Sequence, residues 1–173
     1  RYEKAGSYIR LLTLLNSVCL HNLAPSELES ELGFLQHNPW TSFAPVAVTV
    51  DELGDFWDGR KIKLPLVVRV NEDELGRPNA GADMTFNFMR LISHAARTHP
   101  LGAGSIVGSG VVSNKDASAG FACIAEKRAW EMATKGQSVT HFLRHGDRVR
   151  LEMVDAQGNS IFGAIDQTVS PVT

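Results

Sequence analysis

The last part of the chain contains the pattern that most restricts its fold. Within residues 147–155, three apolar residues alternate with three charged ones: Val149, Leu151 and Met153 with Arg148, Arg150 and Glu152. Successive side chains of a β-strand point to opposite faces, so this alternation predicts a strand with one buried and one solvated face. A turn at 156–159 and a second strand over 160–169 complete an expected hairpin. The rest of the chain must supply a core for its apolar face.

Other stretches predict further strands and helices. Strands are expected over 43–50, which is rich in valine, over 61–70, where Ile62, Leu64 and Leu66 share one face, and over the glycine-punctuated 103–112. A first helix is expected over 8–23. Residues 117–134 are expected to begin as a loop and to continue as a helix. A third helix is expected to start at Asp83 as its cap and to be the longest after the first, because an apolar stripe follows. These elements do not alternate regularly, which favours an α+β fold with a mixed or antiparallel sheet.

Bulk composition excludes several functional classes. The 173 residues are 43% apolar and 21% charged with a formal net charge of −2, which indicates one globular domain. No run of lysine and arginine exceeds two residues, so no nucleic-acid partner is expected. No apolar run approaches the ~20 residues of a membrane span, and no signal peptide is visible, so we expect no membrane association and a cytoplasmic location. Cys19 and Cys123 are expected to be buried and reduced.

Local motifs alone do not define a catalytic site. The glycines between 102 and 110 lack the lysine and the following helix of a phosphate-binding loop. The acidic residues between 51 and 58 lack the glycine and terminal glutamate of a calcium-binding loop. The six histidines are scattered without metal-ligand spacing. From the residues alone, the prediction ends at an α+β domain.

Three long stretches resemble the bacterial branch of the fumarylacetoacetate hydrolase family. They are GRPNAGADMTFNFMRLISHAARTHPLGAGSIVGSGVVSN at 76–114, FLRHGDRVRLEMVDAQGNSIFGAIDQTV at 142–169, and YIRLLTLLNSVCLHNLAPSEL with FLQHNPWTSFAPVAVT within 8–49. The resemblance covers nearly the whole of residues 1–173, as a single domain. It implies a mixed β-roll, a homodimer, and a divalent metal (Mg²⁺ or Mn²⁺) that is held by carboxylates and helps to cleave a C–C bond of a small oxo acid or diketone. It also implies that a segment preceding Arg1, in the same or a second chain, supplies an E-x-E metal-ligand pair and a catalytic histidine.

The resemblance places family site positions on residues that lack the family's functional groups. Ser17 stands where the family has an aspartate metal ligand, and His21 stands where it favours arginine. The catalytic lysine corresponds to Asn38, or to His37 if the loop is aligned one residue earlier. The resemblance therefore makes Ser17 the metal position and assigns His21 and Asn38 to the catalytic positions.

The remaining positions lie later in the chain. The substrate-contacting glycine and threonine correspond to Gly110 and Val111, and Glu126 corresponds to the glutamate that orients the catalytic histidine. With aspartate, lysine and threonine replaced, we expect a hydrolase with a degraded or altered site. The alternatives are a non-catalytic binding or dimer partner, and a metal-independent isomerase or cyclase. The site positions are expected to line one cavity.

Overall fold

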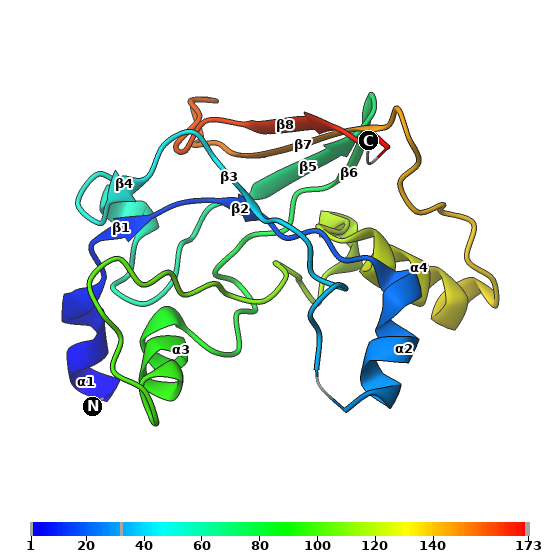
Figure 1. The fold of residues 1–173 in the computed structure, drawn as a ribbon. Coiled ribbons are helices and arrows are strands. Elements are labelled where there is room, and N and C mark those ends of the chain that lie inside the picture. Colours follow the sequence, from blue (N-terminus) through cyan, green and yellow to red (C-terminus); the bar gives the residue numbers. More distant parts are fainter. Residues whose placement is uncertain (1, 32, 172–173) are drawn as a thin grey trace.

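The computed structural model describes residues 2–31 and 33–171 (Figure 1). Its helices are α1 (Tyr2–Ala5), α2 (Ala24–Glu29), α3 (Phe88–Ala95) and α4 (Ile124–Lys135), with 3₁₀ turns at Gly6–Tyr8, His21–Leu23, Gly54–Phe56 and Ala117–Ala119. Its strands are β1 (Leu11–Leu12), β2 (Leu15–Asn16), β3 (Ser42–Phe43), β4 (Val48–Thr49), β5 (Leu66–Val70), β6 (Asp73–Gly76), β7 (Arg148–Met153) and β8 (Ile165–Thr168). Every strand pairing within the described residues is antiparallel. The fold is α+β.

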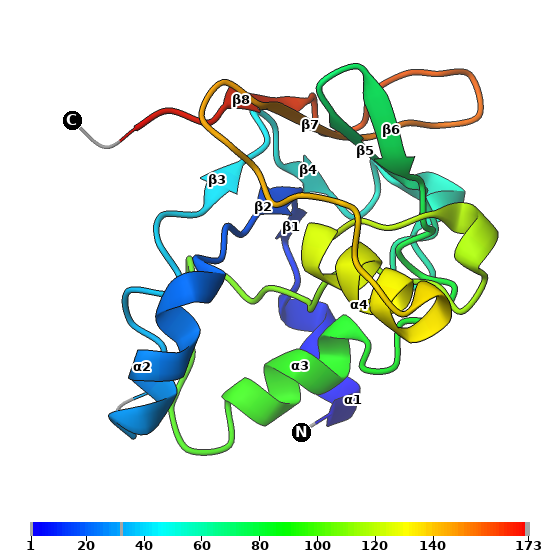
Figure 2. The same ribbon diagram turned by 90° about the vertical axis from the view of Figure 1, so that its right-hand side faces the viewer.

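The largest sheet has four strands in the order β6-β5-β7-β8. It confirms the alternation in 147–155, because Leu151 pairs with Val68 and Met153 with Leu66 on a buried face. In the 61–70 segment, only 66–70 form a regular strand, but Ile62 and Leu64 are buried as expected. Both ribbon views place the helices on one side of this sheet (Figures 1 and 2).

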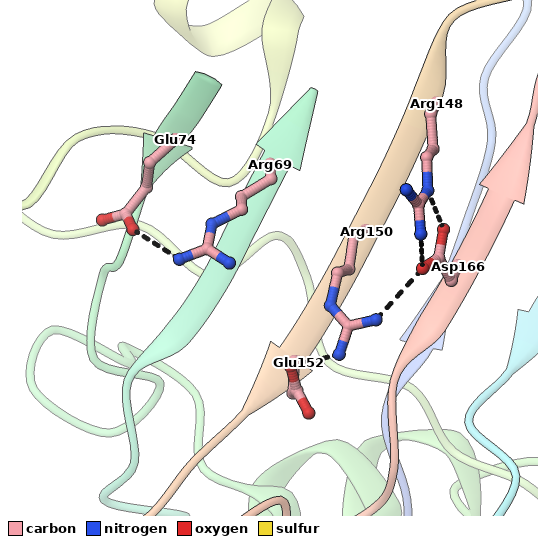
Figure 3. Close-up of polar contacts among 6 residues, drawn as sticks. All are labelled: Arg69, Glu74, Arg148, Arg150, Glu152 and Asp166. Carbon is pink, nitrogen blue, oxygen red and sulfur yellow. Dashed lines mark hydrogen bonds and ion pairs between the residues drawn. The ribbon is translucent and has the colours of Figure 1, made fainter. Parts of the chain in front are cut away.

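The opposite face of the sheet carries a network of charged side chains (Figure 3). Arg150 lies opposite Arg69 on one side and opposite Asp166 on the other. Asp166 accepts hydrogen bonds from Arg148 and Arg150 at 2.6 and 3.0 Å, and these lower the pKa of Asp166 to about 2. Because each arginine is offset by a carboxylate, this face carries no large net charge.

The expected helix over 8–23 is wrong. Residues 11–16 are extended and pair with 42–49 through β1–β4 and β2–β3, and Ala44 N–H donates to Leu14 carbonyl between the two pairs. Leu12 and Leu14 are buried two residues apart, which is the period of a strand. The expected strand over 43–50 is accordingly split into β3 and β4, with Pro45 between them.

Three further expectations need correction. The helix expected from Asp83 is α3, which begins at Phe88 and is capped by Asn87, whose side chain accepts the Arg90 N–H. Asp83 instead accepts the N–H of Lys115. The longest helix is α4, with 12 residues, and it follows the loop expected in 117–134.

The expected strand over 103–112 does not form. This segment begins with a turn at 103–104 and has no strand partner within the described residues, and most of its residues are exposed. Both cysteines are free thiols, but neither is buried as expected: Cys19 is exposed and Cys123 is half-buried.

The core joins the two layers of strands. Its buried residues come from the 11–49 ladder, from β5 and β7, and from the connection between β7 and β8; they include Leu12, Leu14, Val48, Leu66, Val68, Leu151, Met153, Phe162 and Ile165. Phe162 is fully buried, and its carbonyl accepts the Val46 N–H at 3.1 Å. This packing positions the ladder that contains β2, and the first candidate site residues, Ser17 and His21, follow β2 in the chain.

Candidate functional site

A large groove of about 2110 Å³ contains four of the seven candidate positions. Ser17 and His21 line it from the segment that follows β2, and Gly110 and Val111 line it from the irregular 101–112 segment. The structure thus brings together residues that lie more than 80 positions apart in the sequence. All four are exposed.

The other walls of the groove are mostly apolar. They include Phe88, Ile92 and Ala96 of α3, the start of α4, and Val68, Leu151 and Met153 from the inner face of the sheet. Ile106 is 70% exposed and Val111 is 62% exposed. Exposed apolar surface on this scale is typical of a binding site or an interface.

His37 and Asn38 do not line the groove. They belong to the 33–40 segment, which is bound to the chain around His21 by a small polar network. Leu20 N–H donates to His37 carbonyl at 2.8 Å, and Cys19 Sγ lies 3.4 Å from Asn38 Oδ1, which it reaches as a donor. Asn38 Oδ1 also lies 3.0 Å from His37 Nδ1. Asn38 is therefore held at the edge of the groove.

Glu27 of α2 fixes this segment from the other side. Its carboxylate accepts the backbone N–H groups of Leu35, Gln36 and His37. Burial on its own would raise the pKa of Glu27, but the N–H groups of Gln36, His37 and Leu35 outweigh it and lower the pKa. His37 is consequently buried, with 8% of its surface exposed.

Aromatic contacts link His21 to two other segments. Its ring lies edge-on to that of His37, with 5.6 Å between centroids, and is stacked on Phe142 at 5.4 Å. Arg128 of α4 lies over the Phe142 ring at 4.5 Å and donates to Thr140 carbonyl. Phe142 also lines the groove, so these contacts define its edge.

Glu131 anchors the segment that carries Phe142. Its carboxylate accepts hydrogen bonds from the N–H and hydroxyl groups of Thr140 and from Val139 N–H, at 2.7–2.9 Å. The Thr140 donors are the main reason that the pKa of Glu131 is lowered to about 2. Only 2% of Glu131 is exposed. No sequence pattern distinguishes this carboxylate from the charged residues around it on α4.

Glu126 lies in the first turn of α4, directly after groove-lining residues Ile124 and Ala125. Ser113 Oγ donates to its Oε1, while Oε2 is buried and has no hydrogen-bond partner in the described structure. A buried carboxylate oxygen without a hydrogen-bond partner is destabilising. Ser113 lies two residues from Val111, which places Glu126 behind the same wall.

Among the described residues, the donor groups at the candidate site positions do not fit a divalent metal ion. Mg²⁺ and Mn²⁺ prefer carboxylate oxygens, and the hydroxyl of Ser17 supplies no negative charge. Within residues 2–31 and 33–171, no three histidine, cysteine, aspartate or glutamate side chains are arranged to hold a metal. In the part of the chain that is described, no helix is both long and apolar enough to cross a bilayer.

This geometry defines the class of the protein: an α+β domain with antiparallel sheets and a large groove. The sequence profile of the fumarylacetoacetate (FAA) hydrolase C-terminal family matches residues 1–170. The chain therefore belongs to the fumarylacetoacetate hydrolase family. A search among curated proteins found no match for it.

Proposed function

We propose that this chain is a fumarylacetoacetate-hydrolase-family domain whose C–C cleavage site has been altered, so that its groove receives a small oxo acid or diketone without a metal site of its own. The observation that carries this proposal is the character of the groove at Ser17, His21, Gly110 and Val111. None of these four positions has a carboxylate or an ammonium group.

Cleavage of a C–C bond in a dicarbonyl compound needs strong stabilisation of the negative charge that develops on the oxygens. Metal ions and cationic donors supply this most effectively, and removal of one preorganised donor costs about 10²–10³-fold in rate. At the matching positions, Ser17 offers a neutral hydroxyl and Val111 offers only methyl groups. Asn38 uses its carbonyl oxygen within the network to Cys19 and His37. The three changes together remove the groups that this chemistry requires.

The exposed walls of the groove support a second part of the proposal. A family β-roll, with a homodimer partner or an additional N-terminal segment, would cover apolar residues such as Leu11, Ile106 and Val111, each more than half exposed. The additional N-terminal segment would also bring a hydrogen-bond donor to Glu126 Oε2. A non-catalytic binding or dimer partner is the second candidate function, and it is favoured by the same apolar surface.

Calorimetric titration with Mg²⁺ and Mn²⁺ tests the proposal. The unmodified protein is expected to show no tight stoichiometric site, and Ser17→Asp alone is expected to change little, because a single carboxylate does not hold a divalent ion. Ser105→Asp, which places the same charge elsewhere on the groove wall, is the matched control. One tight metal site in the unmodified protein, lost on Ser17→Ala and kept on Ser105→Ala, would contradict the proposal.

A further inference from the structure

A second hollow, of about 460 Å³, lies between α1 and α3, and its walls carry cationic and hydroxyl side chains. It is lined by Tyr2 of α1 and by Arg90, Ser93, His94 and Arg97 of α3 and its C-terminal end. Both ribbon views show α1 and α3 side by side (Figures 1 and 2). We call this hollow the α3 pocket.

The spacing of the α3 residues explains why they converge. Positions 93 and 94 lie three and four residues after position 90, and position 97 lies four and three residues after them, so the four form one stripe along the helix and its C-terminal end. Phe88 and Ile92 of the same helix, with Ala96 at its C-cap, line the large groove, and Ser93 borders both the groove and the α3 pocket. The helix therefore presents an apolar side to the groove and a cationic side to the α3 pocket.

The cations of the α3 pocket are not neutralised by carboxylates. Across the described ranges, the ion pairs involve Lys63, Arg69, Arg77, Arg148 and Arg150, and neither Arg90 nor Arg97 is among them. Arg90 lies over the Phe86 ring at 5.4 Å, which leaves its N–H groups able to donate.

The hydroxyl groups of the α3 pocket add uncharged donors. Tyr2 Oη accepts a hydrogen bond from Asn87 Nδ2 at 3.1 Å, so its own proton remains able to donate. Ser93 contributes a second hydroxyl to the lining. The C-terminal carbonyls of α3 repel an anion, but their combined partial charge of about −0.5 is smaller in magnitude than the positive charge of two guanidinium groups.

We propose that the α3 pocket binds the phosphate group of a soluble small molecule, a site that is independent of the function proposed for the groove. Two guanidinium groups and two hydroxyls provide more donors than the two oxygens of a carboxylate can accept, whereas a phosphate presents three or four oxygens. The two formal positive charges match a phosphate dianion.

Isothermal titration calorimetry with inorganic phosphate and with phenyl phosphate, at constant ionic strength in chloride, tests this proposal. The unmodified protein is expected to bind one equivalent saturably. Arg90→Gln and Arg97→Gln are each expected to weaken binding about tenfold or more, since each removes a charge-assisted contact. Arg144→Gln, which removes the same charge from the loop before β7, is expected to leave the affinity unchanged.

Circular dichroism of each variant establishes that the fold is retained, and the two single variants give independent readings. The proposal is overturned if phosphate does not bind saturably, or if both α3 variants bind it as the unmodified protein does. Sedimentation with phosphatidic acid vesicles separates the two sources of a phosphate group. Capture by vesicles without binding of either soluble probe would assign these cations to a lipid surface and would also overturn the proposal.

Discussion

Replacement of Phe162 by alanine is expected to destabilise the protein strongly, because this side chain joins the two layers of strands. Phe162 is fully buried in the core cluster that contains Leu12 and Val48 from one layer and Leu151 from the other. Truncation of a buried phenylalanine to alanine costs about 3–5 kcal/mol, as transfer free energy and as the cavity that remains. For a domain of this size, each kcal/mol lowers Tm by about 2–4 °C, so Phe162→Ala is expected to lower it by about 6–20 °C.

Phe86→Ala is the matched control, since Phe86 is 54% exposed and lies outside the core cluster. Its effect on the free energy of unfolding is expected to stay within about 1 kcal/mol. Urea unfolding followed by circular dichroism gives both values from the midpoints and slopes. Equal destabilisation by the two variants would refute the claim that Phe162 holds the layers together.

Three further predictions concern charges and close backbone contacts. The pKa of Glu131 is lowered to about 2 from 4.5, so the ionised carboxylate stabilises the fold above pH 4.5, and this stabilisation is lost as the pH falls toward 2. In Tm measurements over pH 2–7, Glu131→Gln should make the decrease of Tm at low pH smaller. Asp166→Asn should flatten a similar loss below pH 3.8, because Arg148 and Arg150 lower the pKa of Asp166 to about 2. Gly76→Ala should prevent stable folding, since a Cβ would lie 2.1 Å from the Phe121 nitrogen, whereas Gly102→Ala meets nothing within 4 Å; soluble yield and Tm compare them.

The sequence predicted β7 well because its alternation extends over a whole strand with a buried face. The second strand of the hairpin was expected over 160–169 but is regular only over Ile165–Thr168. The same reasoning failed at 8–23, where apolar residues at mixed spacings satisfied a helical pattern while Leu12 and Leu14 already followed the period of a strand. Their partners lie at 42–49, and pairing over such a separation leaves no mark on the local sequence. The strand predicted over 103–112 is absent because the apolar residues of this segment find no strand partner in the described structure.

The candidate site was only partly accessible from the sequence. Family resemblance indicated Ser17, His21, Gly110 and Val111, and the structure places these four on one groove. The family resemblance does not indicate that Phe142 stacks on His21, because a lone phenylalanine in a loop belongs to no recognisable pattern. The sequence does not reveal the α3 pocket, because the apolar stripe of α3 indicates only which side of the helix is covered and does not show that Tyr2 lies beside Arg90 and Arg97.

Turnover of a simple acylpyruvate by the unmodified protein, with Mg²⁺ and with excess chelator, tests the altered-site proposal most directly. The proposal predicts no chelator-sensitive cleavage, because Ser17, Asn38 and Val111 lack the carboxylate, ammonium and hydroxyl groups that the chemistry uses. It also predicts that Ser17→Asp, Asn38→Lys and Val111→Thr remain inactive singly, and that metal-dependent turnover appears only in the triple variant combined with an E-x-E segment. Cleavage by the unmodified protein that the chelator abolishes would contradict the proposal and establish an ordinary metal-dependent hydrolase of the family.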